Sequence, residues 1–114
     1  MTFPVANQDV LQTQMDQLRN GNANVRRQAV ASLGVLGRAA PAAITALADA
    51  LHDFDSQVRK EAALALGRTG PRAKADVPAL LSALVDESEV VRRAAAEVLG
   101  RPVAPAGNWR VHPG

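Results

Sequence analysis

The sequence predicts an all-α fold, an α–α superhelix (solenoid) of three helix pairs with six short helices. The first observation is a repeat: Val25, Val58 and Val91, each followed by an arginine, recur every 33 residues. A Leu-Gly pair eight residues after each valine keeps the same spacing. A fixed period of this size indicates a stacked repeat array. The second observation is an alanine-rich composition with only 3% aromatic residues, which favours closely packed helices over sheet.

The bulk composition limits the classes of protein to consider. The 114 residues suit one small domain. The absence of cysteine excludes disulfides and cysteine-ligated zinc. A formal charge of +2, from 13 Lys and Arg against 11 Asp and Glu, does not by itself indicate nucleic-acid binding. We see neither a secretory signal nor a membrane span, so we expect a cytoplasmic protein.

The first helix is expected over about residues 8–19, after an N-terminal lead at residues 1–7. One stripe of this helix is apolar and carries Val10, Leu11, Met15 and Leu18. The following Asn-Gly-Asn segment is expected to end the helix. Gly21 would supply a left-handed turn, and Asn22 would cap the next helix.

The next three helices follow from similar signals. One covers 23–36 and is closed by Gly37. The next begins at Pro41, a residue suited to a first turn, and ends near His52. The fourth is capped by Asp55 or Ser56 and stops at the Gly-Pro dipeptide at 70–71.

The last two helices are expected over about 74–85 and 89–99. Pro78 lies early in the first of them and moves its expected start a residue or two later. The apolar stripe of that helix includes Leu80, Leu81 and Leu84. Gly100 and Pro102 end the second.

These helices pair as an A helix and a B helix in each repeat. The expected repeats cover about 8–37, 41–70 and 74–102 of a repeat domain at 8–102. No single pair can bury its own apolar stripe, so stability must come from stacking neighbouring pairs. Three repeats are about the minimum for such an array.

The repeat resembles the short HEAT-like repeat of the phycobilisome (PBS) lyase type. The family pattern runs Asp-x-Asp-x-x-Val-Arg-x-x-Ala-Ala-x-x-Leu-Gly-x-x-Gly, followed by a Val-Pro-Ala-Leu helix. Here it reads from Asp53 through Val58, Ala62, Leu66 and Gly70, and then 77–80. The chain lacks the aromatic pattern of tetratricopeptide repeats and the Thr-Pro-Leu-His turn of ankyrin repeats. The resemblance covers about residues 8–102 and is specific for fold rather than for function.

The resemblance also implies a structural role for one arginine in each repeat. In such repeats the B helices line the inner surface, and the arginine after the valine meets an acidic loop residue of a neighbouring repeat. The match therefore implies an arginine ladder. Its members are Arg26, Arg59 and Arg92, with Asp53 and Asp86 as acidic partners. Asn20 stands at the equivalent place in the first repeat, where we expect a weaker connection.

Two sets of B-helix residues are candidates for partner binding. A basic row is formed by Arg27, Lys60 and Arg93, each about 100° round its helix from the ladder arginine. Arg68 and Arg101 form a second, shorter row. An aliphatic set consists of Ala31, Val35, Leu64 and Val90. Together these residues could bind an acidic or helical protein segment, or phosphates. The alternative is an ordinary solvated face of mixed charge.

Two further clusters have simpler interpretations. The glycine pairs at 34 and 37 and at 67 and 70 favour close helix contact with a C-terminal cap, not phosphate binding. His52, with Asp53 and Asp55, could in principle hold a metal. However, the other repeats do not support the cluster, and a loop with a cap and a ladder residue accounts for it. We therefore expect no metal, cofactor or catalytic site.

The C-terminal tail at 103–114 is rich in proline and glycine and cannot continue the array. The last B helix would then expose the side that carries Val90, Ala94 and Val98. We hypothesise that Trp109 and Val111 fold back over the last repeat or dock onto another chain, with a homo-oligomer through this end as one arrangement. The alternative is a disordered tail.

These observations predict a non-enzymatic protein-interaction module, an adaptor or a small subunit of a larger assembly. Nucleic-acid binding along the basic row is the alternative, although no aromatic residue accompanies the row for base stacking. The resemblance implies a bilin lyase-related subunit as a second alternative. The identity of the partner does not follow from the sequence.

Overall fold

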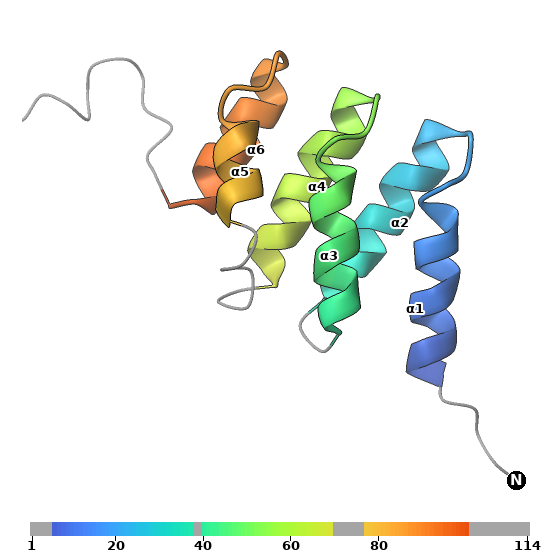
Figure 1. Ribbon diagram of the computed structural model, residues 1–114. Coiled ribbons are helices and arrows are strands. Elements are labelled where there is room, and N and C mark those ends of the chain that lie inside the picture. Colours follow the sequence, from blue (N-terminus) through green and yellow to red (C-terminus); the bar gives the residue numbers. More distant parts are fainter. Residues whose placement is uncertain (1–5, 38–39, 70–76, 101–114) are drawn as a thin grey trace, which may run out of the picture.

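The computed structural model describes residues 6–37, 40–69 and 77–100, and within them it contains six helices (Figure 1). In chain order these are α1 (Ala6–Gln17), α2 (Ala23–Leu36), α3 (Pro41–Ala50), α4 (Ser56–Arg68), α5 (Val77–Ala83) and α6 (Glu89–Val98). The predicted all-α solenoid of six short helices is therefore confirmed.

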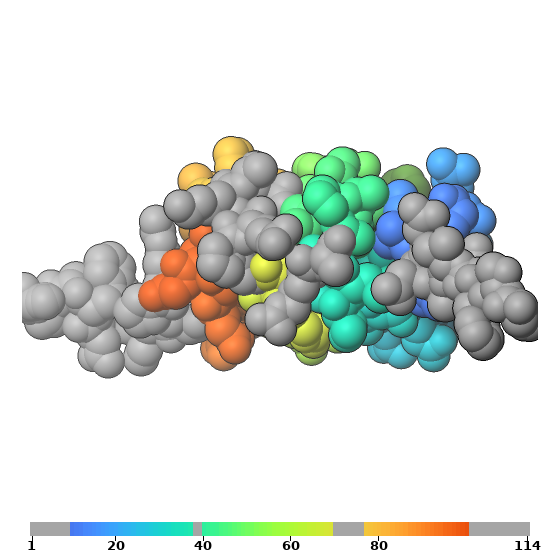
Figure 2. Space-filling model, turned by 90° about the horizontal axis from the view of Figure 1, so that it is seen from below, coloured from blue at the N-terminus to red at the C-terminus, as the bar shows by residue number. Residues whose placement is uncertain are grey.

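The helices form two layers (Figure 1). The B helices α2, α4 and α6 pack side by side and make the most extensive contacts between helices, while α1, α3 and α5 lie against them as the A layer. Seen from below in Figure 2, the chain advances along the array from blue to red without doubling back. Each repeat therefore contacts mainly its neighbours, as expected of a solenoid.

Local sequence accounts for where the B helices begin. The Asn22 side chain accepts a hydrogen bond from the Asn24 N–H, at 2.8 Å, and the Asp55 side chain accepts one from the Gln57 N–H, at 2.7 Å. Both bonds satisfy amide donors that a helix start leaves without an intrahelical partner. α6 has no such bond at Ser88, but Glu89 places a negative charge in its first turn, which the helix dipole favours.

A single apolar core runs through the array between the two layers. Its largest members are fully buried leucines from four successive helices, Leu33, Leu47, Leu66 and Leu80. Alanines at 62, 63 and 65 fill the space around α4 and are also fully buried. Small residues let the central B helix lie close to both neighbours, which explains the alanine-rich composition.

Two glycines lie where neighbouring B helices approach closely. A Cβ on Gly34 would lie 2.7 Å from the Ala65 Cβ, and one on Gly67 would lie 2.8 Å from a Val98 methyl. Such distances are too short for carbon atoms, which pack at about 3.5–4 Å. These glycines therefore set how closely α2 meets α4 and how closely α4 meets α6.

Gly37 closes α2 as predicted, with its N–H bonded to the Leu33 carbonyl, but the role predicted for Gly21 needs correction. In the described chain only Gly100 has a positive φ, +77°, so the left-handed turn expected at Gly21 is wrong. The Asn20 side chain builds that turn instead by accepting the Asn22 N–H at 2.8 Å. Gly37 is right-handed, with φ −61°, and is small because a Cβ there would lie 2.6 Å from the Thr69 methyl.

Several predicted details of the helices also differ from the structure. α1 begins two residues earlier than expected and ends at Gln17 rather than Arg19. Val10 and Leu81 were expected in apolar stripes but are 45% and 43% exposed, because each is turned away from the core. The expected start of the fifth helix at residue 74 and the tail at 103–114 lie outside the described residues.

Candidate interaction surfaces

The B helices are joined by ion pairs that have the same geometry at both joints. The Nε of Arg26 in α2 lies 2.9 Å from Asp53, and the Nε of Arg59 in α4 lies 3.0 Å from Asp86. Both arginines bind the second carboxylate oxygen through Nη2 at 3.2 Å. Each guanidinium thus grips the carboxylate of the next repeat in a bidentate manner, which is the strong form of this interaction.

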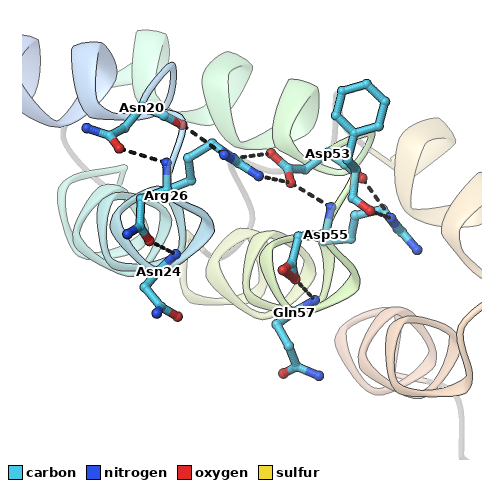
Figure 3. A network of polar contacts seen from close by, with 9 residues as sticks. Asn20, Asn24, Arg26, Asp53, Asp55 and Gln57 are labelled. Atoms are coloured by element: carbon cyan, nitrogen blue, oxygen red, sulfur yellow. Dashed lines mark hydrogen bonds and ion pairs between the residues drawn. The ribbon is translucent and has the colours of Figure 1, made fainter.

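The same arginines also bind the turn of their own repeat. Nη1 of Arg26 donates to the Asn20 carbonyl at 2.8 Å, and Nη1 of Arg59 donates to the Asp53 carbonyl at 2.7 Å. Figure 3 shows how Arg26 lies between Asn20 and Asp53. Each arginine therefore connects two consecutive turns.

The acidic residue of each turn is held by its own backbone. Asp53 accepts the Asp55 N–H and Asp86 accepts the Ser88 N–H, both at 2.8 Å.

Burial by itself would raise the pKa of Asp86. The hydrogen bonds from Ser88 and Arg59 and the charges of Arg59 and Arg92 together bring that pKa below its ordinary value. The hydrogen bond to Asp53 is the main cause of the raised pKa of Arg26. The acids at these joints therefore make structural contacts. In the cluster with His52, Asp53 forms the turn and the ion pair, and Asp55 caps α4.

The predicted basic row takes one residue from each of the B helices α2, α4 and α6. Arg27 and Lys60 are half-buried, whereas Arg93 is exposed. Arg93 is paired with Glu89 one helical turn away, at 3.2 Å. An exposed pair of this kind contributes little to stability, but it offsets part of the row's charge.

The aliphatic residues next to the row differ in exposure. Val35 is 69% exposed and Val90 is 38% exposed, while Ala31 and Leu64 are half-buried. Leu64 also packs against the core. Arg68 reaches from α4 toward α2, where its Nη1 lies 3.2 Å from the position that a Gly34 Cβ would occupy. The term B surface below means these B-helix residues. They are Arg27, Ala31, Val35, Lys60, Leu64, Arg68, Val90 and Arg93.

The prediction that Ala94 and Val98 of α6 stay unstacked is wrong. Ala94 is buried, and Val98 packs on Gly67 of α4. Arg92, Ala96 and Leu99 of α6 stand one period after Arg59, Ala63 and Leu66, and all three are more exposed than those equivalents. The expected roles of Trp109 and Val111 lie outside the described residues.

One groove was missed by the sequence analysis. It lies between α1 and α3 and contains adjoining cavities of about 280 Å³ and 170 Å³. Met15, Leu18 and Ala46 are among its apolar lining, and Asp16 and Asp49 are acidic members. A signal was present, because Asp16 and Asp49 are one period apart.

The fold and its joints define a class of protein, the helical repeat arrays that stack α-hairpins. Within this class, a family model for HEAT repeats matches residues 11–100, and the chain belongs to that family. HEAT repeats generally mediate protein–protein interaction and typically act as non-enzymatic scaffolds. The match is to HEAT repeats in general, and the PBS-lyase subtype remains a prediction.

A comparison with curated proteins gives no significant match. In the part of the chain that the structure describes, no helix has the length and apolar character needed to cross a membrane.

Proposed function

We propose that the chain is a non-enzymatic, cytoplasmic protein-interaction module, an adaptor or a small subunit of a larger assembly, that binds its partner through the B surface. The observation that carries the proposal is the continuity of this surface. Because α2, α4 and α6 pack side by side, residues one period apart fall into rows that cross all three helices. Arrays of this kind offer extended surfaces of the type used for binding.

The chemistry of the rows favours a protein segment as the ligand. A row with Arg27, Lys60 and Arg93 runs beside exposed aliphatic groups, of which Val35 is the most exposed. An amphipathic helix with acidic residues along one edge would match both kinds of group.

The charges near the row argue against phosphate binding. Arg93 is paired with Glu89, and Glu61 and Glu97 stand one helical turn from the basic and aliphatic positions. A nucleic-acid surface would gain its affinity from uncompensated cations.

The proposal is tested by capturing partners from a lysate of the source organism with the wild-type chain and with two variants, with and without nuclease. Val35→Glu together with Lys60→Glu disrupts the B surface. Thr45→Glu, at an exposed site on α3, is the matched control on the A layer. Mass spectrometry then quantifies the proteins bound to each.

We expect a stoichiometric protein that survives nuclease, binds the control as well as the wild type, and is lost from the double variant. Equal capture by the control and the double variant would overturn the assignment to the B surface. Loss of all partners after nuclease, with binding that collapses between low and moderate salt, would instead support nucleic-acid binding.

A further inference from the structure

The two complete joints of the array show what a third would require. Arg26 and Arg59 use Nη1 to bind the carbonyl of their own turn, and Nε with Nη2 to bind the next carboxylate. Arg92 makes the first of these contacts, with its Nη1 2.6 Å from the Asp86 carbonyl. In the described ranges no carboxylate lies within ion-pair distance of Arg92. The arginine is thus held in the ladder position with the carboxylate-binding edge of its guanidinium unused.

The apolar positions beside Arg92 are also exposed relative to their equivalents. Val30 and Ala63, in B helices that are each followed by another repeat, are fully buried, whereas Ala96 at the same position is only half-buried. The same change occurs from Leu66 to Leu99. Arg92, Ala96 and Leu99 lie at i, i+4 and i+7 and so share one side of α6. We call this side the α6 end face.

The sequence that follows α6 contains no carboxylate side chain for this face. After Arg92 the only acidic residue is Glu97, which lies within α6 itself, and residues 101–114 contain no aspartate or glutamate. Residues 101–114 therefore supply no acidic side chain that could complete a third joint of this kind.

We propose that the α6 end face docks a partner helical hairpin that carries an aspartate in the turn between its helices. The aspartate would occupy the place relative to Arg92 that Asp53 has at Arg26 and Asp86 has at Arg59. The hairpin would cover Ala96 and Leu99, whose equivalents Val30 and Leu33 in α2 are fully buried. This surface is separate from the B surface, so the two assignments can fail independently.

The opposite end of the molecule indicates why the occupant is not a second copy of this chain. In a head-to-tail stack the first turn of one copy would meet Arg92 of the next. That turn carries Asn20, a neutral amide whose oxygen already accepts the Asn22 N–H. Charge complementarity with Arg92 is absent there. Because a head-to-tail contact that does not close produces filaments, the asparagine also disfavours such growth.

The probe for the experiment is a tandem form of the full chain, with a second copy of residues 68–100 inserted after Gly100. The copy of Asp86 then follows Arg92 at the same spacing of 27 residues that separates the other pairs. Urea unfolding is measured with this position as Asp or Asn, each combined with wild-type Arg92 or Arg92→Gln. The matched control repeats the cycle with Arg93→Gln, since Arg93 is adjacent in the sequence and is paired with Glu89 within α6.

We expect the change from Asp to Asn to lower the ratio of folded to unfolded protein about tenfold when Arg92 is present. With Gln at 92 the effect should be small, and the Arg93 cycle should show no coupling. Coupling that is absent at Arg92, or equal at Arg92 and Arg93, would overturn the proposal.

Sedimentation of the unmodified chain tests the choice of occupant. We expect a monomer over the concentrations used. Self-association that is abolished by Arg92→Glu and retained by Arg93→Glu would show that a second copy covers the face, and would overturn the assignment to an aspartate-bearing partner.

Discussion

The central B helix α4 and the last B helix α6 carry the same Val-Arg and Leu-Gly pattern, one period apart, but lie in different surroundings. In α4, Arg59 is 8% exposed and Leu66 is fully buried. In α6, Arg92 is exposed and Leu99 is half-buried. The residue types are the same, so the difference comes from the neighbour on each side. In a solenoid the contribution of a side chain depends on whether the next repeat covers it.

The largest expected difference between the two helices is in their leucines. Leu66→Ala should lower the free energy of unfolding by about 3 kcal/mol, because it leaves a cavity between packed helices. Leu99→Ala should cost about 1 kcal/mol, since part of that side chain already meets solvent. Urea denaturation of both variants checks this, and equal losses would contradict the comparison.

The next largest difference is expected between the stability costs of replacing the two arginines. Arg59→Gln removes a bidentate contact with Asp86 and leaves a partly buried carboxylate without its cation, which we expect to cost about 2 kcal/mol. Arg92→Gln removes the contact with the Asp86 carbonyl and a charge that favours ionised Asp86, but no bidentate pair, and should cost about 0.5 kcal/mol. A double-mutant cycle of Arg59→Gln with Asp86→Asn measures the ion pair directly. The absence of coupling would show that the pair is not formed in solution.

The two glycines at the joints sharpen the comparison further. Alanine favours a helix over glycine by about 1 kcal/mol, but at Gly34 its Cβ would meet both the side chain and the backbone of Ala65. We expect Gly34→Ala to destabilise by about 1 kcal/mol overall. Gly67→Ala meets only Val98 side-chain atoms, so its effect should be closer to zero. Thermal unfolding that ranks Gly67→Ala as the worse variant would refute this explanation.

The smallest expected effect is on the pH dependence of the free energy of unfolding. The pKa of Asp86 is lowered in the folded protein, so its contribution to stability is fully present above the ordinary aspartate pKa of about 4 and is lost as the pH falls through the lower folded value. The stability difference between the wild type and Asp86→Asn should therefore narrow below about pH 4. Urea titrations at several pH values measure it. A difference that widens on acidification would mean that folding raises the pKa of Asp86 instead of lowering it.

The period made most of the fold predictable. Identical residues at constant spacing must occupy equivalent places, so the six helices, their order and their pairing follow from the valine, arginine and leucine positions. The caps at Asn22 and Asp55 were predictable because they depend on neighbouring residues only. The helix that extends beyond its predicted start at residue 8 shows that terminal positions carry weaker signals.

The surfaces were less predictable, because they depend on which side of each B helix faces the next repeat. A repeat period shows which residues are equivalent, but not which side of a helix faces the next repeat. Val98 was therefore predicted to be unstacked, although it packs on Gly67. Predicting the groove between α1 and α3 likewise requires knowing how far apart the two helices lie. Its recurring aspartates at 16 and 49 were visible in the sequence, but their shared cavity was not.

The arginine that links two turns has a consequence for how such genes change in length. Each one reaches back 6 residues and forward 27, and these two distances add up to one period. A tandem duplication or deletion of one whole period that begins after Asn20 therefore carries one donor and one acceptor with it. The remaining joints stay matched after the event. Recombination can therefore lengthen or shorten the array in a single step without leaving an unpaired arginine inside it.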